Sequence, residues 1–152
     1  MDLLHRTSRV HGEDIRRFVQ ALVFNWLICG TDAHARNYAL LLEHNSVRLA
    51  PLYDLNSHLA YSDGRGNHLS MQVNGQFGAA ALSVDDWIAF APKLRVDQDW
   101  IRDEIRRQSD RLIEDMSVAA QQEDIARYDS PAVARLIVNA ERWARRLLHR
   151  TT

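Results

Sequence analysis

A cluster of polar side chains lies between two apolar segments of this sequence and comprises Thr31, Asp32, His34, Arg36 and Asn37. A second aspartate, Asp54, follows the run Leu-Ala-Pro-Leu-Tyr. Polar clusters placed in this way often carry function. Carboxylate and amide oxygens are the hard ligands that Mg²⁺ prefers, and a carboxylate can also orient or deprotonate an attacking hydroxyl group. These residue types are therefore suited to chemistry on phosphate groups.

The spacing of these residues narrows the chemistry further. Asp32 and Asn37 are five residues apart, as are the aspartate and asparagine in the catalytic loop of protein kinases. Asp54 would supply a further metal ligand. Between them, Tyr38 to Leu42 and Val47 to Leu49 are expected to form two short strands joined by a polar turn. Such a hairpin would bring Asp54 back beside Asn37.

The two motifs Thr-Asp-x-His-x-Arg-Asn and Leu-Ala-Pro-x-Tyr-Asp match a known family in identity, order and spacing. They resemble the C-terminal lobe of the HipA-like serine/threonine kinases, which are the toxins of bacterial type II toxin–antitoxin systems. The resemblance continues through Leu69 to Gly75 and the helical tail from Val84 onward. It implies a single domain over residues 1–152 with a connector at 1–12. The implied fold is mainly α-helical, a kinase-like C-lobe with a small β-hairpin that carries the metal-binding segment.

The resemblance also implies roles for individual residues. Asp32 would be the catalytic base, Arg36 would stabilise phosphate charge, and Mg²⁺ would be bound by Asn37 and Asp54. Arg36 stands where the family usually has lysine, so a cation is kept in a planar form that is always charged. Six residues would contact ATP, namely His34, Ala35, Arg36, Asn37, Tyr53 and Asp54.

The implied activity is transfer of the ATP γ-phosphate to a hydroxyl of a protein substrate, which the sequence does not identify. A kinase also needs a glycine-rich phosphate loop and a lysine, which an N-terminal lobe normally supplies. No glycine-rich loop precedes Asp32, and the one lysine, Lys93, follows it. We therefore expect this chain to lack the N-terminal lobe that binds the ATP phosphates, and to be inactive without it. The resemblance implies a HipB-like antitoxin as partner, with DNA contacted only indirectly through that antitoxin.

Each residue taken alone also has a structural interpretation. Asp32 and Asn37 are residue types common in turns, and Asp54 is suited to capping a short helix that begins at Leu55. Two alternatives remain open for the whole chain. One is a catalytically silent lobe that binds a partner, for example an antitoxin, through the face that an N-lobe would cover.

The other alternative is a metal-dependent hydrolase, in which His34 and other histidines would bind a transition metal. The remaining candidate histidines, His44, His58 and His68, lie at no regular ligand spacing. A site made of one histidine with aspartate and asparagine favours Mg²⁺, so the hydrolase is the weaker hypothesis.

One helix is predicted to place Asp32 at its end. Apolar residues recur at intervals of three and four from Glu13 to Leu27, which is the pattern of one helical face, and Gly30 is the expected stop. After Asp54, a short helical turn is expected within Leu55–Tyr61.

The second half of the chain is predicted to be one strand followed by three helices. The strand covers His68–Val73 and ends in the turn dipeptide Asn74-Gly75. The helices begin after the cap residues Ser83, Asp97 and Ser130, and the first two are expected to stop at Pro92 and near Met116. The four tryptophans, Trp26, Trp87, Trp100 and Trp143, are expected to pack in the core.

The composition indicates an ordinary globular domain. It is 46% hydrophobic and 26% charged, and its net charge of -1 gives no general attraction to nucleic acid or membranes. The single cysteine, Cys29, excludes an intrachain disulfide and is typical of a reducing compartment. The longest apolar stretch, residues 21–29, is too short to span a bilayer, and no signal peptide is apparent. We therefore expect a cytoplasmic protein with no membrane association.

Overall fold

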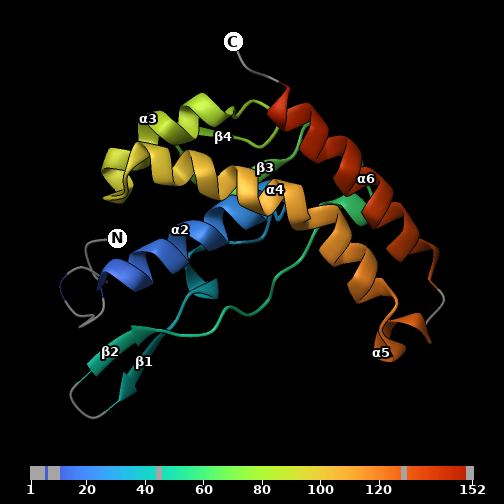
Figure 1. Ribbon diagram of the computed structural model, residues 1–152, viewed down its shortest axis with the longest axis horizontal. Coiled ribbons are helices and arrows are strands. Elements are labelled where there is room, and N and C mark those ends of the chain that lie inside the picture. The colour runs from blue at the N-terminus through green and yellow to red at the C-terminus, as the bar shows by residue number, and fades with distance from the viewer. Residues whose placement is uncertain (1–5, 7–10, 44–45, 128–129, 150–152) are drawn as a thin grey trace.

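The computed structural model describes residues 6, 11–43, 46–127 and 130–149 (Figure 1). Five helices account for most of them: α2 (His11–Leu27), α3 (Val84–Leu94), α4 (Gln98–Ala120), α5 (Glu123–Ala126) and α6 (Pro131–Leu148). Two antiparallel hairpins pair β1 (Leu40–Glu43) with β2 (Ser46–Leu49) and β3 (His68–Val73) with β4 (Gln76–Gly78). Two 3₁₀ turns, η1 (Ala35–Asn37) and η2 (His58–Ala60), complete the elements. The expected fold, mainly helical with a small hairpin, is confirmed.

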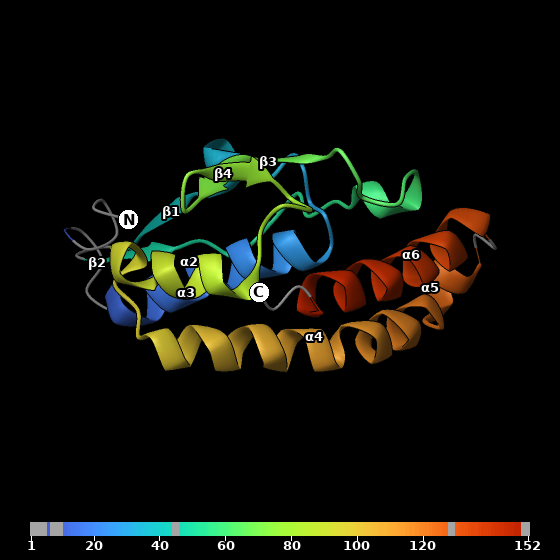
Figure 2. The same cartoon turned by 90° about the horizontal axis from the view of Figure 1, so that it is seen from above.

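The helices form a layer with the hairpins on one side of it. Helix α4 packs against α2, α3 and α6, and the two hairpins lie on the side of α2 and α3 that faces away from α4 (Figure 2). Strand β2 contacts α2, and β3 contacts α3. In the described parts of the chain, no helix combines the length and the apolar character needed to cross a membrane.

The core is centred on Trp26 near the end of α2. Its ring lies 5.6 Å from that of Trp87 in α3. Its Nε1 donates to the carbonyl of Ala79, and its own carbonyl accepts a hydrogen bond from Nε1 of Trp143 in α6. These three tryptophans are almost fully buried, which confirms the prediction, while Trp100 is only partly buried. Trp26 therefore fixes the end of α2 against two other helices.

The end of α2 differs from the prediction in one residue. Cys29, with φ of 52°, adopts the left-handed conformation that terminates the helix, and Gly30 does not. The amide of Gly30 donates to the carbonyl of Asn25, and the amide of Cys29 donates to that of Trp26. This pair of bonds is the Schellman arrangement, which satisfies the last carbonyls of a helix. Cys29 is buried, as expected.

Helix α3 passes through Pro92, where it was predicted to stop. It ends instead at Leu94, and Arg95 adopts a left-handed conformation with φ of 58°. Proline cannot donate to the carbonyl four residues earlier, which belongs to Ile88. The side-chain amide of Gln98 donates to that carbonyl at 3.1 Å and replaces the missing bond.

The three predicted cap residues are confirmed. Ser83 forms a capping box with Asp86, Asp97 caps α4, and Ser130 caps α6, which begins at Pro131. Helix α4 continues four residues beyond Met116 to Ala120, and α5 was not predicted. Most of the predicted connector, residues 1–12, lies outside the described residues, and its last two residues belong to α2.

The first hairpin was predicted, and one strand of the second was predicted. The first has the expected antiparallel pairing, with Leu40 opposite Leu49, and its turn at residues 44–45 lies outside the described part. Strand β3 matches the prediction, but β4 was missed. Asn74 and Gly75 form the turn between β3 and β4, and their φ values of 49° and 82° suit the tight turn of a hairpin.

Candidate functional site

The polar cluster forms a compact loop directly after α2. The amide of His34 donates to the carbonyl of Asp32 at 2.8 Å, and the amide of Asn37 donates to that of His34 at 3.0 Å. Asp32 and His34 are exposed, with 3.9 Å between Oδ1 and Nε2. The hydroxyl of Ser70 in β3 donates to the carbonyl of Thr31 at 2.6 Å. Asp32 is therefore exposed to solvent on a loop whose backbone is held by its own hydrogen bonds and by the bond from Ser70.

Asn37 and Asp54 meet as predicted. Nδ2 of Asn37 donates to Oδ2 of Asp54 at 2.7 Å. Asn37 is 7% exposed, and its other side-chain atom, Oδ1, has no hydrogen-bond partner among the described residues. Asp54 is exposed and has a φ of 56°, which is uncommon for a residue other than glycine. Such conformations concentrate at functional sites.

Asp54 does not cap a helix, so the structural alternative for this residue, a helix cap before Leu55, is wrong. The expected helical turn is confined to η2, and its cap is Ser57, whose Oγ accepts from the amide of Leu59. The Oγ of Ser57 also donates to the carbonyl of Ile28 at 2.5 Å. Ser57 therefore joins the segment that carries Asp54 to the end of α2.

Two more hydrogen bonds hold the Asp54 segment against the polar loop. The hydroxyl of Tyr53 donates to the carbonyl of Arg36 at 2.6 Å. The amide of His58 donates to the carbonyl of Cys29 at 3.2 Å. Together with the bond of Ser57, these contacts keep residues 28–37 and 53–58 side by side. The Asn37–Asp54 contact is therefore set by several independent bonds.

Asn25 and Gly30 shape the turn beneath the loop. Asn25 is 4% exposed, and its Nδ2 donates to the carbonyl of Ala21 and to the hydroxyl of Tyr38. A Cβ at Gly30 would lie 2.5 Å from Oδ1 of Asn25 and 3.1 Å from the carbonyl oxygen of Asn56. Gly30 is thus required by close packing. Burial raises the pKa of Tyr38, although its hydrogen bond from Asn25 acts in the opposite direction.

Asp14 at the start of α2 anchors the hairpin. It is fully buried, and its Oδ2 accepts from the amide of Leu49 in β2 at 2.9 Å. The amide of Ala50 then donates to the carbonyl of Ala39. Sequence reasoning missed Asp14, Asn25 and Ser57. The one available signal was that Asp14 and Asn25 are polar residues beside the apolar positions of α2.

The remaining predicted residues are only partly brought together. Ala35 and Arg36 lie exposed in η1, and in the described chain the guanidinium of Arg36 forms no ion pair. Among the residues the structure describes, no hydrogen bond or ion pair joins Asp32 to Asn37 or Asp54. The same residues contain no group of three or more His, Cys, Asp or Glu side chains that could hold a metal ion.

Residues 1–124 match the family model described as HipA-like C-terminal domain. The chain belongs to this family. The matched residues include α2, both hairpins, α3 and α4.

Two curated relatives are similar to this chain over part of their own length. The chain is 31% identical over 123 residues to "Putative kinase Y4mE" of Sinorhizobium fredii (strain NBRC 101917 / NGR234), which covers 76% of this chain and 29% of that protein. It is 29% identical over 100 residues to "Putative kinase Y4dM" of the same organism. That alignment covers 65% of this chain and 24% of that protein. The chain thus spans less than a third of the length of these relatives.

A solved structure shares the fold. The chain superposes with a TM-score of 0.64 and 21% identity on a chain of the Shewanella oneidensis MR-1 toxin–antitoxin complex of HipA, HipB and operator DNA. The match covers 88% of this chain and 33% of that one. It shows that the arrangement of helices and hairpins is that of a HipA C-terminal lobe.

Proposed function

We propose that this chain is the catalytic C-terminal lobe of a HipA-like serine/threonine kinase that transfers the γ-phosphate of ATP to a protein hydroxyl. The observation that carries the proposal is the contact between Asn37 and Asp54, in which one buried amide oxygen has no hydrogen-bond partner among the described residues. Relatives named as kinases support the same activity.

The donor set of this pair fits Mg²⁺. Within the described parts of the chain Oδ1 of Asn37 accepts no hydrogen bond, and the exposed carboxylate of Asp54 lies against the same amide group. Mg²⁺ commonly takes only one or two protein oxygens and completes its shell with phosphates and water, so a third protein ligand is not required. Bound there, it would neutralise charge on the ATP phosphates. Asn37 and Asp54 are the residues that would hold it.

Asp32 would act on the hydroxyl of the protein substrate. Its side chain is 65% exposed, so an incoming hydroxyl has access to it. As the hydroxyl oxygen forms its bond to the γ-phosphorus, the bond from that phosphorus to the ADP oxygen breaks, and the hydroxyl proton passes to Asp32. Arg36, exposed and without an ion pair among the described residues, would face the phosphate charge, and His34, Ala35 and Tyr53 would contact the nucleotide.

The proposed kinase needs a second lobe. A phosphate loop and lysine must come from an N-terminal lobe, either in the same longer protein or from a partner. Two large apolar side chains beside the site, Tyr53 and Leu55, are 47% and 46% exposed, and a covering lobe would bury them. A HipB-like antitoxin is the further partner we propose, with DNA reached only through it, in the cytoplasm.

Calorimetric titration of the chain with Mg²⁺ and ATP tests the proposed site. We expect weak binding that requires Mg²⁺, and Asp54→Asn should reduce the affinity at least about tenfold, since even residues that only support metal ligands contribute this much. Asp103→Asn, at an exposed position of α4, is the matched control and should bind as the wild type does.

Two outcomes would count against the proposal. Equal affinity in Asp54→Asn and the wild type would show that ATP binds elsewhere on the chain. Absence of binding by the wild type, with a folded protein by circular dichroism, would instead favour the silent lobe that binds a protein partner.

A further inference from the structure

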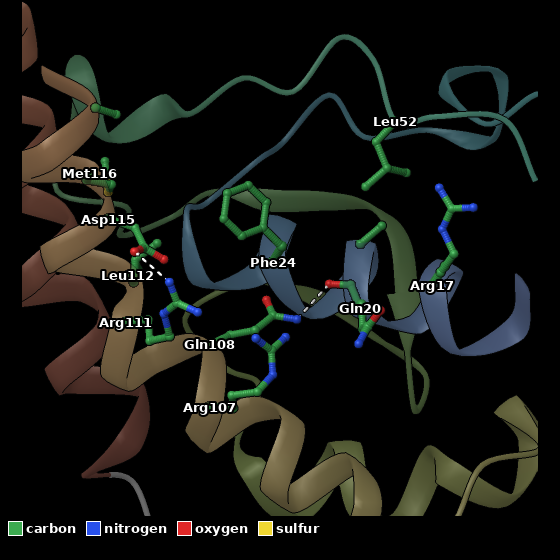
Figure 3. Close-up of a pocket in the computed structure, with 12 residues that line it drawn as sticks. Arg17, Gln20, Phe24, Leu52, Arg107, Gln108, Arg111, Leu112, Asp115 and Met116 are labelled. Carbon is green, nitrogen blue, oxygen red and sulfur yellow. Dashed lines mark hydrogen bonds and ion pairs between the residues drawn. The ribbon is translucent and has the colours of Figure 1, made fainter. Parts of the chain in front are cut away.

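A groove separate from the Asn37–Asp54 site runs between α2 and α4. Its volume is about 500 Å³. One wall is the face of α2 from Arg17 to Phe24, the other is the face of α4 from Arg107 to Ala119, and Leu52 reaches in from the loop before Asp54 (Figure 3). The two helices touch beneath the groove.

The stretches of the two helices that line the groove are long enough to hold a chain segment. The stretch of α4 that lines it, residues 107–119, spans about 18 Å at the rise of an α-helix. The stretch of α2, residues 17–24, spans about 10 Å. Two to three turns of a bound helix match these lengths, and amphipathic helices bind in grooves of this kind through residues at intervals of three and four.

The floor of the groove is apolar. Phe24, Leu52, Leu112 and Met116 contribute to it, and methionine adapts its shape to different partners. An apolar stripe on a bound helix would remove this surface from water, which is the main favourable term in such association.

The rim of the groove is positive. Three arginines, Arg17, Arg107 and Arg111, line it against a single aspartate, Asp115. Arg111 is paired with Asp115 at 3.2 Å, and Arg107 is paired with Glu104. Arg17 is exposed and has no ion pair among the described residues. The charge complement of this rim is a segment with carboxylates beside its apolar stripe.

Gln108 links the two walls of the groove. Nε2 of Gln108 donates to the carbonyl of Gln20 at 3.1 Å and to Oε1 of Glu104 at 2.7 Å, which fixes the direction of the amide (Figure 3). Its Oε1 is buried and has no partner among the described residues. The bond to the carbonyl of Gln20 joins α4 to α2 at the groove.

We propose that this groove binds an acidic amphipathic helix of a partner protein, with the apolar stripe on the floor and the carboxylates toward the arginines. The inference rests on the groove alone and does not depend on the proposed kinase activity. A basic helix and a second copy of this chain are the alternatives that the experiment must separate.

Fluorescence anisotropy with two synthetic helical peptides tests the proposal on the full chain. Each peptide has about 15 residues, the length at which an isolated helix begins to form, with leucines every three or four positions. The first carries glutamates beside the leucines, and the second carries lysines in their place. We expect saturable binding of the acidic peptide and at least about tenfold weaker binding of the basic one, because complementary charges set partner choice.

Three variants locate the binding. Arg17→Glu should weaken the acidic peptide about fivefold by reversing a rim charge, and Met116→Glu should weaken it more by placing a charge on the floor. Arg106→Glu is the matched control, because Arg106 is an exposed residue of α4 outside the groove, and it should leave binding unchanged.

The proposal is overturned by equal binding of both peptides, by unchanged binding in Arg17→Glu, or by no saturation up to about 1 mM peptide, which corresponds to only about 4 kcal/mol. Arg17 is exposed, so its variant remains informative even where Met116→Glu fails to fold. Sedimentation of the chain alone as a dimer that Arg17→Glu dissociates would assign the groove to a second copy and would also overturn it.

Discussion

Replacing Gly30 with alanine tests whether close packing against α2 holds the polar loop. The new methyl group would lie 2.5 Å from Oδ1 of Asn25 and 3.1 Å from the carbonyl of Asn56. Asn25 cannot simply turn away, because it is 4% exposed and its Nδ2 is bound to Ala21 and Tyr38. We therefore expect Gly30→Ala to displace Asn25 and the backbone of the Asp54 segment together.

The expected loss of stability in Gly30→Ala has two contributions. Inserting a methyl group into a well-packed site costs about 1 to 3 kcal/mol. Losing one of the hydrogen bonds of buried Asn25 costs about 1 kcal/mol more. The sum, about 2 to 4 kcal/mol, is a large part of the roughly 5 to 15 kcal/mol of a typical domain, so the variant should still fold but melt several degrees lower.

Urea unfolding followed by circular dichroism measures this cost. Gly12→Ala is the control, because a Cβ there meets nothing within 4 Å, and it should lie within about 1 kcal/mol of the wild type. In an Asn25→Ala background the clash with Oδ1 is gone, so Gly30→Ala should cost at least about 1 kcal/mol less there. The same cost in both backgrounds, or a cost under about 0.5 kcal/mol in the wild type, would refute the packing argument.

Three further predictions concern other parts of the fold. Gln98→Ala should lower the free energy of unfolding in urea by about 0.5 to 1 kcal/mol, because the carbonyl of Ile88 loses its donor; an unchanged value would mean that water satisfies it. Burial raises the pKa of Glu104, but hydrogen bonds from Arg107 and other neighbours outweigh this and leave its pKa lowered. The stability that Glu104 contributes is therefore complete above its usual pKa and is lost as the pH falls through the lowered one. Glu104→Gln should flatten the loss of stability between about pH 5 and 3. Parallel stability curves for the variant and the wild type would contradict this. Burial also raises the pKa of the Cys29 thiol, so an aromatic disulfide reagent should label it only as fast as the fold opens, and immediate labelling at pH 8 would contradict its burial.

The helices and the first hairpin were predictable because local signals specify them. Ser83, Asp97 and Ser130 each accept a hydrogen bond from the backbone of the helix that follows, an interaction that depends on residues only two or three positions away. The meeting of Asn37 and Asp54 was predictable for a related reason. A short antiparallel hairpin returns the chain to its starting point, so residues that flank it lie close together.

The errors arose where a distant residue changes a local rule. Pro92 would end an isolated helix, but Gln98 supplies the donor that proline lacks. Cys29 adopts a left-handed conformation that its residue type disfavours, because the core around Trp26 and the hydrogen bond from His58 hold it there. Ser57 gave no signal because its function as a link to Ile28 depends on tertiary structure.

Nuclear magnetic resonance of the ¹⁵N-labelled chain with Mn²⁺ and ATP tests most directly the claim that Asn37 and Asp54 form one metal site for a nucleotide. Mn²⁺ accepts the same oxygen ligands as Mg²⁺ and broadens the signals of nearby nuclei. We expect the amide signals of Asn37 and Asp54 to broaden together when both Mn²⁺ and ATP are present, while that of Asp103 does not. Broadening confined to other residues would contradict this claim. Broadening at positions 37 and 54 that persists in Asp54→Asn would contradict it too.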